Sequence, residues 1–173
     1  MAGKVQLVVF RVGAEEFAVD IMHTKEVVVP REITPVPETQ DYVEGVMNLR
    51  GNLIPVLDFR KRLRGHGIAH NADRRIIIAR VDGKTLGMMV DSASEVIRID
   101  SSMIEAAPDI ISEIGADYVS GVVNFSGRFI VMVDLAKALD GDITCELDQV
   151  LNVLSSRAGG RDSTSQPGLE RAI

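Results

Sequence analysis

The chain nearly repeats one of its own segments. Residues 42–59, YVEGVMNLRGNLIPVLDF, return 76 positions later as YVSGVVNFSGRFIVMVDL, residues 118–135, and eight of the eighteen positions are identical in register. A similar echo lies upstream, where residues 8–20 resemble residues 77–91. Two related units in one compact chain predict paired subdomains, and we expect function to lie at the positions where the copies differ.

Short runs rich in valine and isoleucine recur along the chain between glycine, proline and aspartate, which is typical of strands. No long helical period separates successive runs, so antiparallel sheets closed into small barrels are favoured over a parallel α/β sheet. The predicted fold class is therefore mainly β with short helices. The expected strands span residues 5–12, 16–21, 46–49, 53–59, 75–81, 86–90, 122–125 and 129–135.

The hydrophobic period changes near the C-terminus. Apolar residues from Ile143 to Leu154 fall on one face of a helix, and Asp142 stands where an N-cap would. This pattern predicts a C-terminal helix over residues 142–154, while residues 155–173, with almost no apolar content, are predicted to be a disordered tail. For a chain of 173 residues, one core-forming domain of two halves, residues 1–154, fits better than separate domains.

Charge and composition exclude several classes of function. The net charge of -6 disfavours a nucleic-acid interface, which needs a basic face. No apolar run approaches the ~18 residues of a membrane span and the N-terminus has no signal-peptide pattern, so we expect no direct membrane insertion. A single cysteine, Cys145, excludes an internal disulfide and fits a reducing compartment. These features predict a cytoplasmic protein.

No group of residues predicts catalysis. Asp20 and Asp91, and likewise Asp58 and Asp134, stand at equivalent repeat positions, which favours capping or turn roles over acid–base chemistry. His66 and His70 stand four apart, but they lie in a glycine-bearing stretch where no helix would align them, so a metal site is disfavoured. Surface or packing roles are favoured for His23 and Cys145. We therefore expect no catalytic residue, no metal site and no cofactor.

Each repeat holds an N-x-x-G segment between two apolar strands, at residues 48–51 and 124–127. A short loop ending in glycine predicts a hairpin with a type I turn followed by a left-handed residue. This geometry explains the asparagine and the glycine, which both copies keep. The third position differs, with Arg50 in the first copy and Ser126 in the second. The fold alone therefore does not require the guanidinium of Arg50.

Two further segments could take part in binding. A basic cluster at residues 60–64 is expected to be a solvated helix face or connector, with contact to an acidic partner as the alternative. The β-branched strip of residues 27–29 is predicted to lie in the core or in an edge strand. An edge strand could also dock another barrel.

With these residues assembled, the chain resembles the CheW family of chemotaxis coupling proteins over residues 7–154. The resemblance rests on five segments: EEFAVDI, EVVVPREITPVP, GVMNLRGNLIPVLDFR, GMMVDSASEVI and YVSGVVNFSGRFIVMVDL. It implies two five-stranded SH3-like barrels, roughly residues 7–75 and 76–140, in agreement with the duplication. It also implies a non-enzymatic adaptor, recruited to receptor arrays at the membrane. Such an adaptor links the cytoplasmic tip of methyl-accepting chemoreceptors to the regulatory domain of a CheA-like histidine autokinase.

The resemblance also implies which residues meet each partner. Arg50 matches the family's characteristic arginine, and Ala93 is expected on the opposing wall of a groove between the barrels. Thr24 departs from the family, which often has an aliphatic residue there, so the groove is expected to be less apolar or to suit a different receptor. The implied receptor contacts are Thr24, Glu26, Val27, Arg50 and Ala93, and the implied kinase contacts are Gly45 and Leu53.

Other functions stay open at this point. A kinase regulatory domain, or a paralogous coupler in a non-motility signalling pathway, would have a similar sequence. A small hydrolase that uses the aspartates is a more distant alternative. Titration with a kinase regulatory domain separates the binding functions from the enzymatic one.

Overall fold

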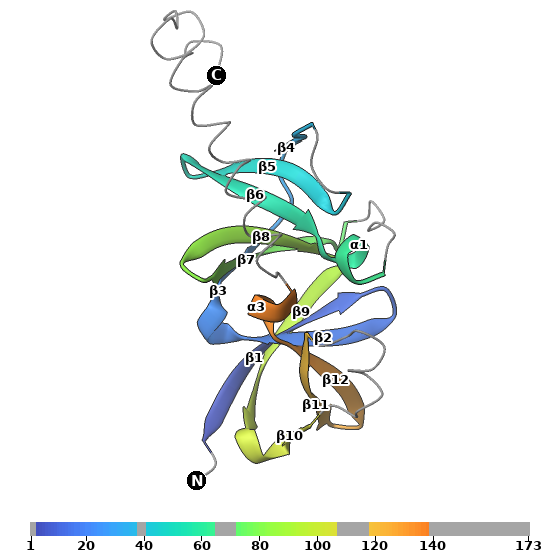
Figure 1. Cartoon of the computed structure of the whole chain (residues 1–173). Helices are drawn as coiled ribbons and strands as arrows, with labels where there is room; N and C mark the ends of the chain where they lie inside the picture. Colours follow the sequence, from blue (N-terminus) through green and yellow to red (C-terminus); the bar gives the residue numbers. More distant parts are fainter. Residues whose placement is uncertain (1–2, 38–40, 65–71, 107–117, 139–173) are drawn as a thin grey trace, which may run out of the picture.

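The computed structural model describes residues 3–37, 41–64, 72–106 and 118–138. In these ranges the chain is mainly β, which confirms the predicted fold class (Figure 1). The first half of the chain forms β1 (Lys4–Val12), β2 (Glu15–Asp20), the 3-10 helix η1 (Ile21–His23), β3 (Thr24–Val28), β4 (Ile33–Thr34), β5 (Val43–Leu49), β6 (Asn52–Asp58) and α1 (Phe59–Arg64). The second half forms β7 (Arg75–Val81), β8 (Lys84–Val90), β9 (Ser92–Asp100), the 3-10 helix η2 (Ser101–Met103), β10 (Ile104–Glu105), β11 (Val119–Phe125), β12 (Arg128–Val133) and α3 (Leu135–Ala138).

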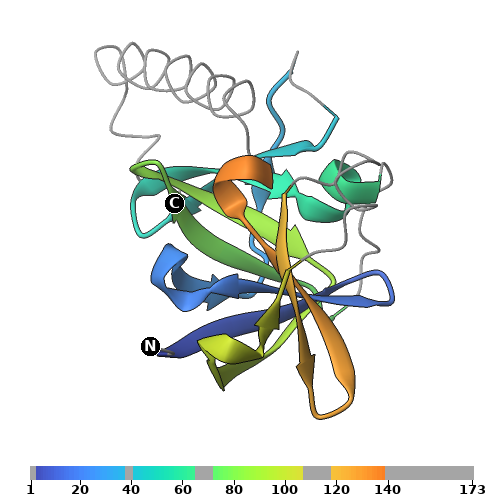
Figure 2. The same ribbon diagram turned by 60° about the horizontal axis from the view of Figure 1, so that its bottom comes forward.

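The strands form two sheets that lie one above the other, with α3 between them (Figure 1). Sheet A has the strand order β10-β11-β12-β2-β1-β9, and sheet B has the order β3-β7-β8-β6-β5-β4. The resemblance implied five strands for each half; a two-residue strand, β10 or β4, adds a sixth to each sheet. Most pairs are antiparallel, but β12 pairs with β2 and β6 pairs with β8 in parallel. In Figure 2 the β11–β12 hairpin projects from sheet A with its turn far from sheet B.

Each sheet combines strands from both halves of the chain. β1 and β2 belong to the first half but pair with β9 and β12 of the second half, in sheet A. β7 and β8 belong to the second half but pair with β3 and β6 of the first half, in sheet B. Residues 7–75 and 76–140, predicted as two interlocking barrel subdomains, therefore each contribute strands to both sheets. The two halves exchange their first hairpins: the strands of sheet B all lie within residues 24–90, whereas sheet A joins residues 4–20 to residues 92–133.

The two halves nevertheless follow the same plan. The Asp58 amide donates to the Tyr42 carbonyl at 2.7 Å, and the Asp134 amide donates to the Tyr118 carbonyl at the same distance, 2.7 Å. The β5–β6 and β11–β12 hairpins also share a register shift near the start of their first strands. Each hairpin is followed by a short helix, α1 or α3. These features confirm that the two N-x-x-G hairpins are equivalent.

The N-x-x-G hairpins close with two-residue turns, not with the type I turn that the sequence predicted. Arg50 and Gly51 form the first turn, with φ of 50° and 87°. Ser126 and Gly127 form the equivalent turn, with φ of 52° and 82°. Positive φ at both residues is characteristic of the type I′ turn, whose twist matches that of the strands it joins. The correction matters because this turn favours Asn, Asp or Gly at its first position, and not Arg.

Three hydrophobic cores stabilise the two sheets. The largest lies between the sheets, and residues of both exchanged hairpins and of α3 contribute to it. The other two are each formed within one sheet, one in sheet B and one in sheet A. β1 contributes to two of them, because alternate side chains of a strand point to opposite faces. Val8 and Phe10 face the core between the sheets, whereas Leu7 and Val9 face the core of sheet A.

Three of the four aspartates that were weighed as carboxylate pairs cap helices. Asp20 accepts a hydrogen bond of 2.9 Å from the Met22 amide at the start of η1. Asp58 and Asp134 each accept from the amide three residues later, at 2.9 Å in α1 and 3.3 Å in α3. Such caps satisfy amide groups that a helix leaves without an internal partner. The capping role predicted for these carboxylates is confirmed.

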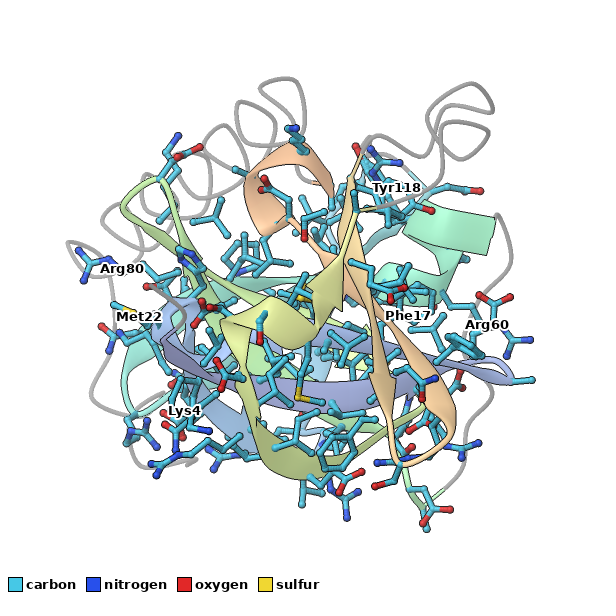
Figure 3. The ribbon with its side chains drawn as sticks, turned by 90° about the horizontal axis from the view of Figure 1, so that it is seen from below. Lys4, Phe17, Met22, Arg60, Arg80 and Tyr118 are labelled. Carbon is cyan, nitrogen blue, oxygen red and sulfur yellow. The ribbon has the colours of Figure 1, made fainter. Side chains whose placement is uncertain are left out.

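Asp91 joins the two exchanged hairpins. Its Oδ2 atom accepts a hydrogen bond of 2.6 Å from the Gly13 amide in the β1–β2 turn. The Asp91 amide in turn donates to the Arg11 carbonyl at 3.0 Å. Arg60 of α1 places its Nη1 atom 3.8 Å from Oδ1 of Asp91, and Figure 3 shows Arg60 beside the tip of the β1–β2 hairpin. This carboxylate therefore connects sheet A, sheet B and α1.

Several predictions lie outside the described residues: the C-terminal helix over residues 142–154, the tail over residues 155–173, and the roles of His66, His70 and Cys145. His23 is exposed in η1, as expected. None of the helices in the described ranges is long and apolar enough to cross a membrane. Over the same residues, no three or more His, Cys, Asp or Glu side chains gather to hold a metal ion.

The exchange of hairpins predicts that neither half of the chain folds alone. A fragment of residues 1–68 lacks β7 and β8, which lie between β3 and β6 in sheet B, and its own β1–β2 hairpin lacks β9 and β12. We expect fragments 1–68 and 69–173 to show no cooperative thermal unfolding by circular dichroism when separate. Equimolar mixing should restore it, with the intact chain as the control. A cooperative melt of either fragment alone would contradict the topology.

Gly45 predicts a second stability effect. Its φ is 143°, and a Cβ atom there would lie 2.1 Å from the Thr34 carbonyl oxygen. We expect Gly45→Ala to lower the free energy of unfolding by roughly 2–4 kcal/mol, because backbone strain and overpacking both oppose it. Urea denaturation measures the change, and Gly3→Ala is the control because nothing lies within 4 Å of the added atom. Equal stability of Gly45→Ala and the unsubstituted protein would refute this reason for the glycine.

Candidate functional site

A pocket of about 380 Å³ opens in sheet B where the edge strand β3 meets the β5–β6 turn. Its apolar lining consists of the buried residues Leu49, Ile54 and Ile78, which belong to the core of sheet B. Polar side chains and one exposed leucine complete the pocket, which is named the sheet B mouth. These rim residues are Lys25, Glu26, Arg50, Asn52, Leu53 and Thr85.

Arg50 and Glu26 join across the sheet B mouth. The Arg50 guanidinium donates a hydrogen bond to the Glu26 carboxylate and forms an ion pair with it. Because β7 and β8 separate β3 from β6 in the sheet, this contact requires the sheet to curve until its edge meets the turn. The hydrogen bond, followed by the charge of Glu26, raises the pKa of Arg50. The guanidinium stays charged, and 63% of the Arg50 side chain remains exposed to solvent.

The backbone gives a second reason to regard Arg50 as functional. At φ 50° it occupies the left-handed region, which costs a residue other than glycine roughly 1–3 kcal/mol. Asn, Asp or Gly at this position would lower that cost. Asp82 has the same φ, 50°, in the β7–β8 turn and is one of the favoured residues. The turn itself would therefore be at least as stable with Asn, Asp or Gly, and the contact that the guanidinium makes within the fold is its ion pair with Glu26.

β3 carries two further predicted receptor contacts at the edge of sheet B. Val27 is 41% exposed and Val29 is 62% exposed, whereas Val28 is buried. This alternation confirms that the valine strip belongs to an edge strand. Thr24 is half-buried, and its hydroxyl oxygen is buried without a hydrogen-bond partner among the described residues. An unsatisfied buried hydroxyl destabilises a fold, so packing does not explain Thr24 either.

Ala93 lies in the other sheet. It pairs with Phe10 in sheet A and packs against the core between the sheets. Thr24 pairs with Ala79, which occupies in β7 the position of Phe10 in β1. Ala93 is therefore the counterpart of Thr24 in the duplication. The structure brings Glu26 and Arg50 together, whereas Ala93 belongs to the equivalent strand of sheet A.

The fold explains the identity of one of the two predicted kinase contacts but not of the other. Gly45 is explained by its close approach to the backbone of Thr34. Leu53 is 41% exposed on the rim of the sheet B mouth, and burial in a core does not explain it. Because Leu53 and Arg50 share this rim, the residues assigned to the two partners adjoin each other.

Three rim residues were missed from the sequence: Lys25, Asn52 and Thr85. Lys25 and Asn52 each neighbour a residue or turn that was singled out, so their position in the chain could have suggested them. Thr85 could not have been found in this way, because the exchanged β7–β8 hairpin brings it from the second half of the chain. All three side chains can donate hydrogen bonds.

A second pocket, of about 260 Å³, lies between the two sheets. Residues from β2, η1, the β7–β8 turn, β12 and α3 line it, among them Asp20, His23, Asp82 and Asp134. The resemblance placed the receptor near a groove between the two subdomains. None of the residues predicted to contact a receptor or a kinase lines this pocket. Within the described part of the chain, the predicted receptor contacts Glu26 and Arg50 line the sheet B mouth instead.

The basic cluster at residues 60–64 is partly engaged within the protein. Arg60 forms the ion pair with Asp91. The guanidinium carbon of Arg62 lies 6.0 Å from the centre of the Tyr42 ring, a distance typical of a cation–π contact. The cluster is therefore more than the solvated helix face that was expected, since Arg60 and Arg62 help to attach α1 to the rest of the fold.

The fold and the sheet B mouth can be compared with known proteins. The protein-family model of the CheW-like domain matches residues 6–142 of the chain. Chemotaxis protein CheW of Rhizobium meliloti is 36% identical over 130 residues, which cover 75% of this chain and 84% of that protein. Chemotaxis protein CheW of Treponema pallidum is 31% identical over 152 residues, which cover 86% of this chain and 88% of that protein.

A solved structure shows the same fold. The crystal structure of scaffolding protein TtCheW from Thermoanaerobacter tengcongensis matches with a TM-score of 0.73 and 34% sequence identity. The match covers 82% of this chain and 91% of that one. The family model, the relatives and the shared fold together show that the chain belongs to the family of proteins with a CheW-like domain.

Proposed function

We propose that this protein is a non-enzymatic adaptor that couples chemoreceptors to a histidine autokinase in chemotaxis-type signalling. The family supports this function, because relatives bear the name chemotaxis protein CheW and the solved homologue is described as a scaffolding protein. One observation carries the receptor part of the proposal. Arg50 occupies a turn position that suits Asn or Gly better, and its guanidinium is exposed beside Glu26.

The partner proposed for the sheet B mouth is the helical cytoplasmic tip of a methyl-accepting chemoreceptor. β3 presents Val27 at the edge of the sheet, Val29 is exposed just after it, and the β5–β6 turn presents Arg50. Apolar side chains next to an exposed guanidinium suit an amphipathic helix with a carboxylate beside its apolar face. Binding there would recruit the adaptor to receptor arrays at the cytoplasmic side of the membrane.

The regulatory domain of a CheA-like kinase is proposed to contact the same hairpin through Leu53. A half-exposed leucine can gain burial at an interface without having been needed by the core. Gly45 contributes by allowing β5 to approach the Thr34 backbone, and therefore acts through the shape of the hairpin. Interfaces of transient signalling complexes are commonly modest in area, so one such apolar contact can matter.

Arg50→Glu separates the receptor role of Arg50 from a structural one. We expect the melting temperature to change by a few degrees at most, since an exposed ion pair contributes little to stability. Binding of the kinase regulatory domain should persist, whereas recruitment to receptors should be lost. Arg50→Asn is the control for the turn, and it should melt at or above the temperature of the unsubstituted protein. Large destabilisation by Arg50→Glu, or undiminished recruitment, would assign Arg50 to another role.

Leu53→Ser tests the kinase contact. Calorimetry with the isolated kinase regulatory domain should show binding about tenfold weaker than that of the unsubstituted protein, as expected when an interface loses an apolar anchor. Stability should change little, because Leu53 is already 41% exposed. Val96→Ser is the matched control, since Val96 is 54% exposed on an edge strand of sheet A. Equal weakening by both substitutions would remove the kinase site from this hairpin.

A further inference from the structure

The residues of the sheet B mouth have counterparts in sheet A, and three of these, Glu16, Glu95 and Arg128, form a cluster that is named the sheet A mouth by analogy. Glu95 stands in β9 where Glu26 stands in β3, since each follows the register shift at which the edge strand meets β1 or β7. Arg128 is the first residue of β12, as Asn52 is the first residue of β6. The residues of the two mouths can therefore be compared position by position.

The exchanged hairpins supply the third position of each mouth. Glu16 pairs with Arg11 next to the β1–β2 turn, and Thr85 pairs with Arg80 at the matching place next to the β7–β8 turn. In sheet A, Glu16 lies opposite Ile130 of the parallel strand β12. Glu16 of sheet A therefore corresponds to Thr85 of sheet B.

The charges of the sheet A mouth are satisfied within the chain. Nη1 of Arg128 lies 3.0 Å from Oε2 of Glu16, and Nη2 of Arg128 lies 2.6 Å from Oε1 of Glu95. The hydrogen bond to Glu95 raises the pKa of Arg128. The Glu16 side chain is only 10% exposed, so one of the two carboxylates is well enclosed. One cation and two carboxylates thus occupy this mouth.

In the sheet B mouth, cations outnumber carboxylates. Two cations, Arg50 and Lys25, line it together with one carboxylate, Glu26. Thr85 stands where sheet A has its second carboxylate, Glu16. Asn52 and Thr85 add neutral hydrogen-bond donors to the same rim. Compared with its counterpart, the sheet B mouth has an excess of donors and one carboxylate fewer.

We infer that a carboxylate of the receptor helix completes the sheet B mouth as Glu16 completes the mouth of sheet A. An Asp or Glu side chain of the partner enters beside Thr85 and accepts hydrogen bonds from Arg50 and Lys25. This inference rests on the proposed function and names the chemical group that the site recognises. It also assigns Lys25, Asn52 and Thr85 to recognition, although Arg50 alone was expected to supply the charge.

Thr85→Glu tests the inference, because it places a carboxylate of the chain itself where the partner's carboxylate is proposed to bind. The equivalent arrangement exists in sheet A, so the fold tolerates it. The probe is a soluble helical-hairpin fragment of a chemoreceptor tip, titrated by calorimetry. We expect Thr85→Glu to weaken binding by about tenfold or more, since like charges at an interface are strongly unfavourable. Thr85→Gln introduces a side chain of the same size as glutamate but without its charge, and this variant should bind within about twofold of the unsubstituted protein.

Two further variants serve as controls: one replaces Thr85→Glu if that variant does not fold, and the other tests whether a charge change elsewhere affects binding. Asn52→Asp introduces a rim carboxylate without a change in size, and it should weaken binding even if Thr85→Glu does not fold. Glu16→Thr removes a charge from the mouth of sheet A and should leave the affinity for the fragment unchanged. The melting temperature of each variant shows whether the fold persists.

The outcomes separate this inference from the proposed function. Failure of the unsubstituted protein to bind the fragment would overturn both. Loss of binding in Arg50→Glu together with full binding by Thr85→Glu and Asn52→Asp would overturn the inference alone. Equal weakening by Thr85→Glu and Thr85→Gln would also overturn it, because size and not charge would then be responsible.

Discussion

The core between the two sheets is the interaction on which the rest of the structure depends. Both exchanged hairpins place one face in it, and the other face of each hairpin packs in the core of its own sheet. The Phe10 ring lies 5.9 Å from that of Phe17 and 5.7 Å from that of Phe59, which begins α1 after the last strand of the first half. Each hairpin thus contributes residues to two cores. The pairing of β8 with β6 also brings Thr85 to the sheet B mouth.

Local features of this fold could be predicted from the sequence, and features that depend on long-range pairing could not. The hairpin at residues 48–51 and the capping role of Asp58 follow from patterns within a few residues. The exchange of hairpins leaves no local signal, so the sequence did not reveal which strands of each predicted subdomain pair in which sheet. β9 was missed because its first residues, Ser92 and Ala93, have weak preferences for strands. Phe59 was assigned to a strand, although the Asp58 cap begins a helix there.

Some residues of the candidate site could likewise be predicted from the sequence, and others could not. Arg50 stood out because its repeat partner is Ser126, and a difference at a retained turn is visible in one sequence. The position of Thr85 at the site could not be predicted, since its strand β8 lies beside β6, where Gly87 pairs with Val56, 31 residues earlier in the chain. The two halves keep their turns and helix caps but differ in charge at the mouths. A few positions thus sufficed to give the sheet A cluster one cation and two carboxylates and the sheet B mouth two cations and one carboxylate.

The exchange of hairpins also sets the order in which the chain can fold as it is synthesised. β2 pairs with β12, so Glu16 must wait for Ile130 to leave the ribosome. At ~5–20 residues per second, that wait is on the order of ten seconds. During this time the face of the first hairpin that packs in the core of sheet A lacks the strands that cover it, and contacts of high sequence separation slow folding further. Sheet A is therefore expected to form later in synthesis than sheet B, whose strands all lie within residues 24–90.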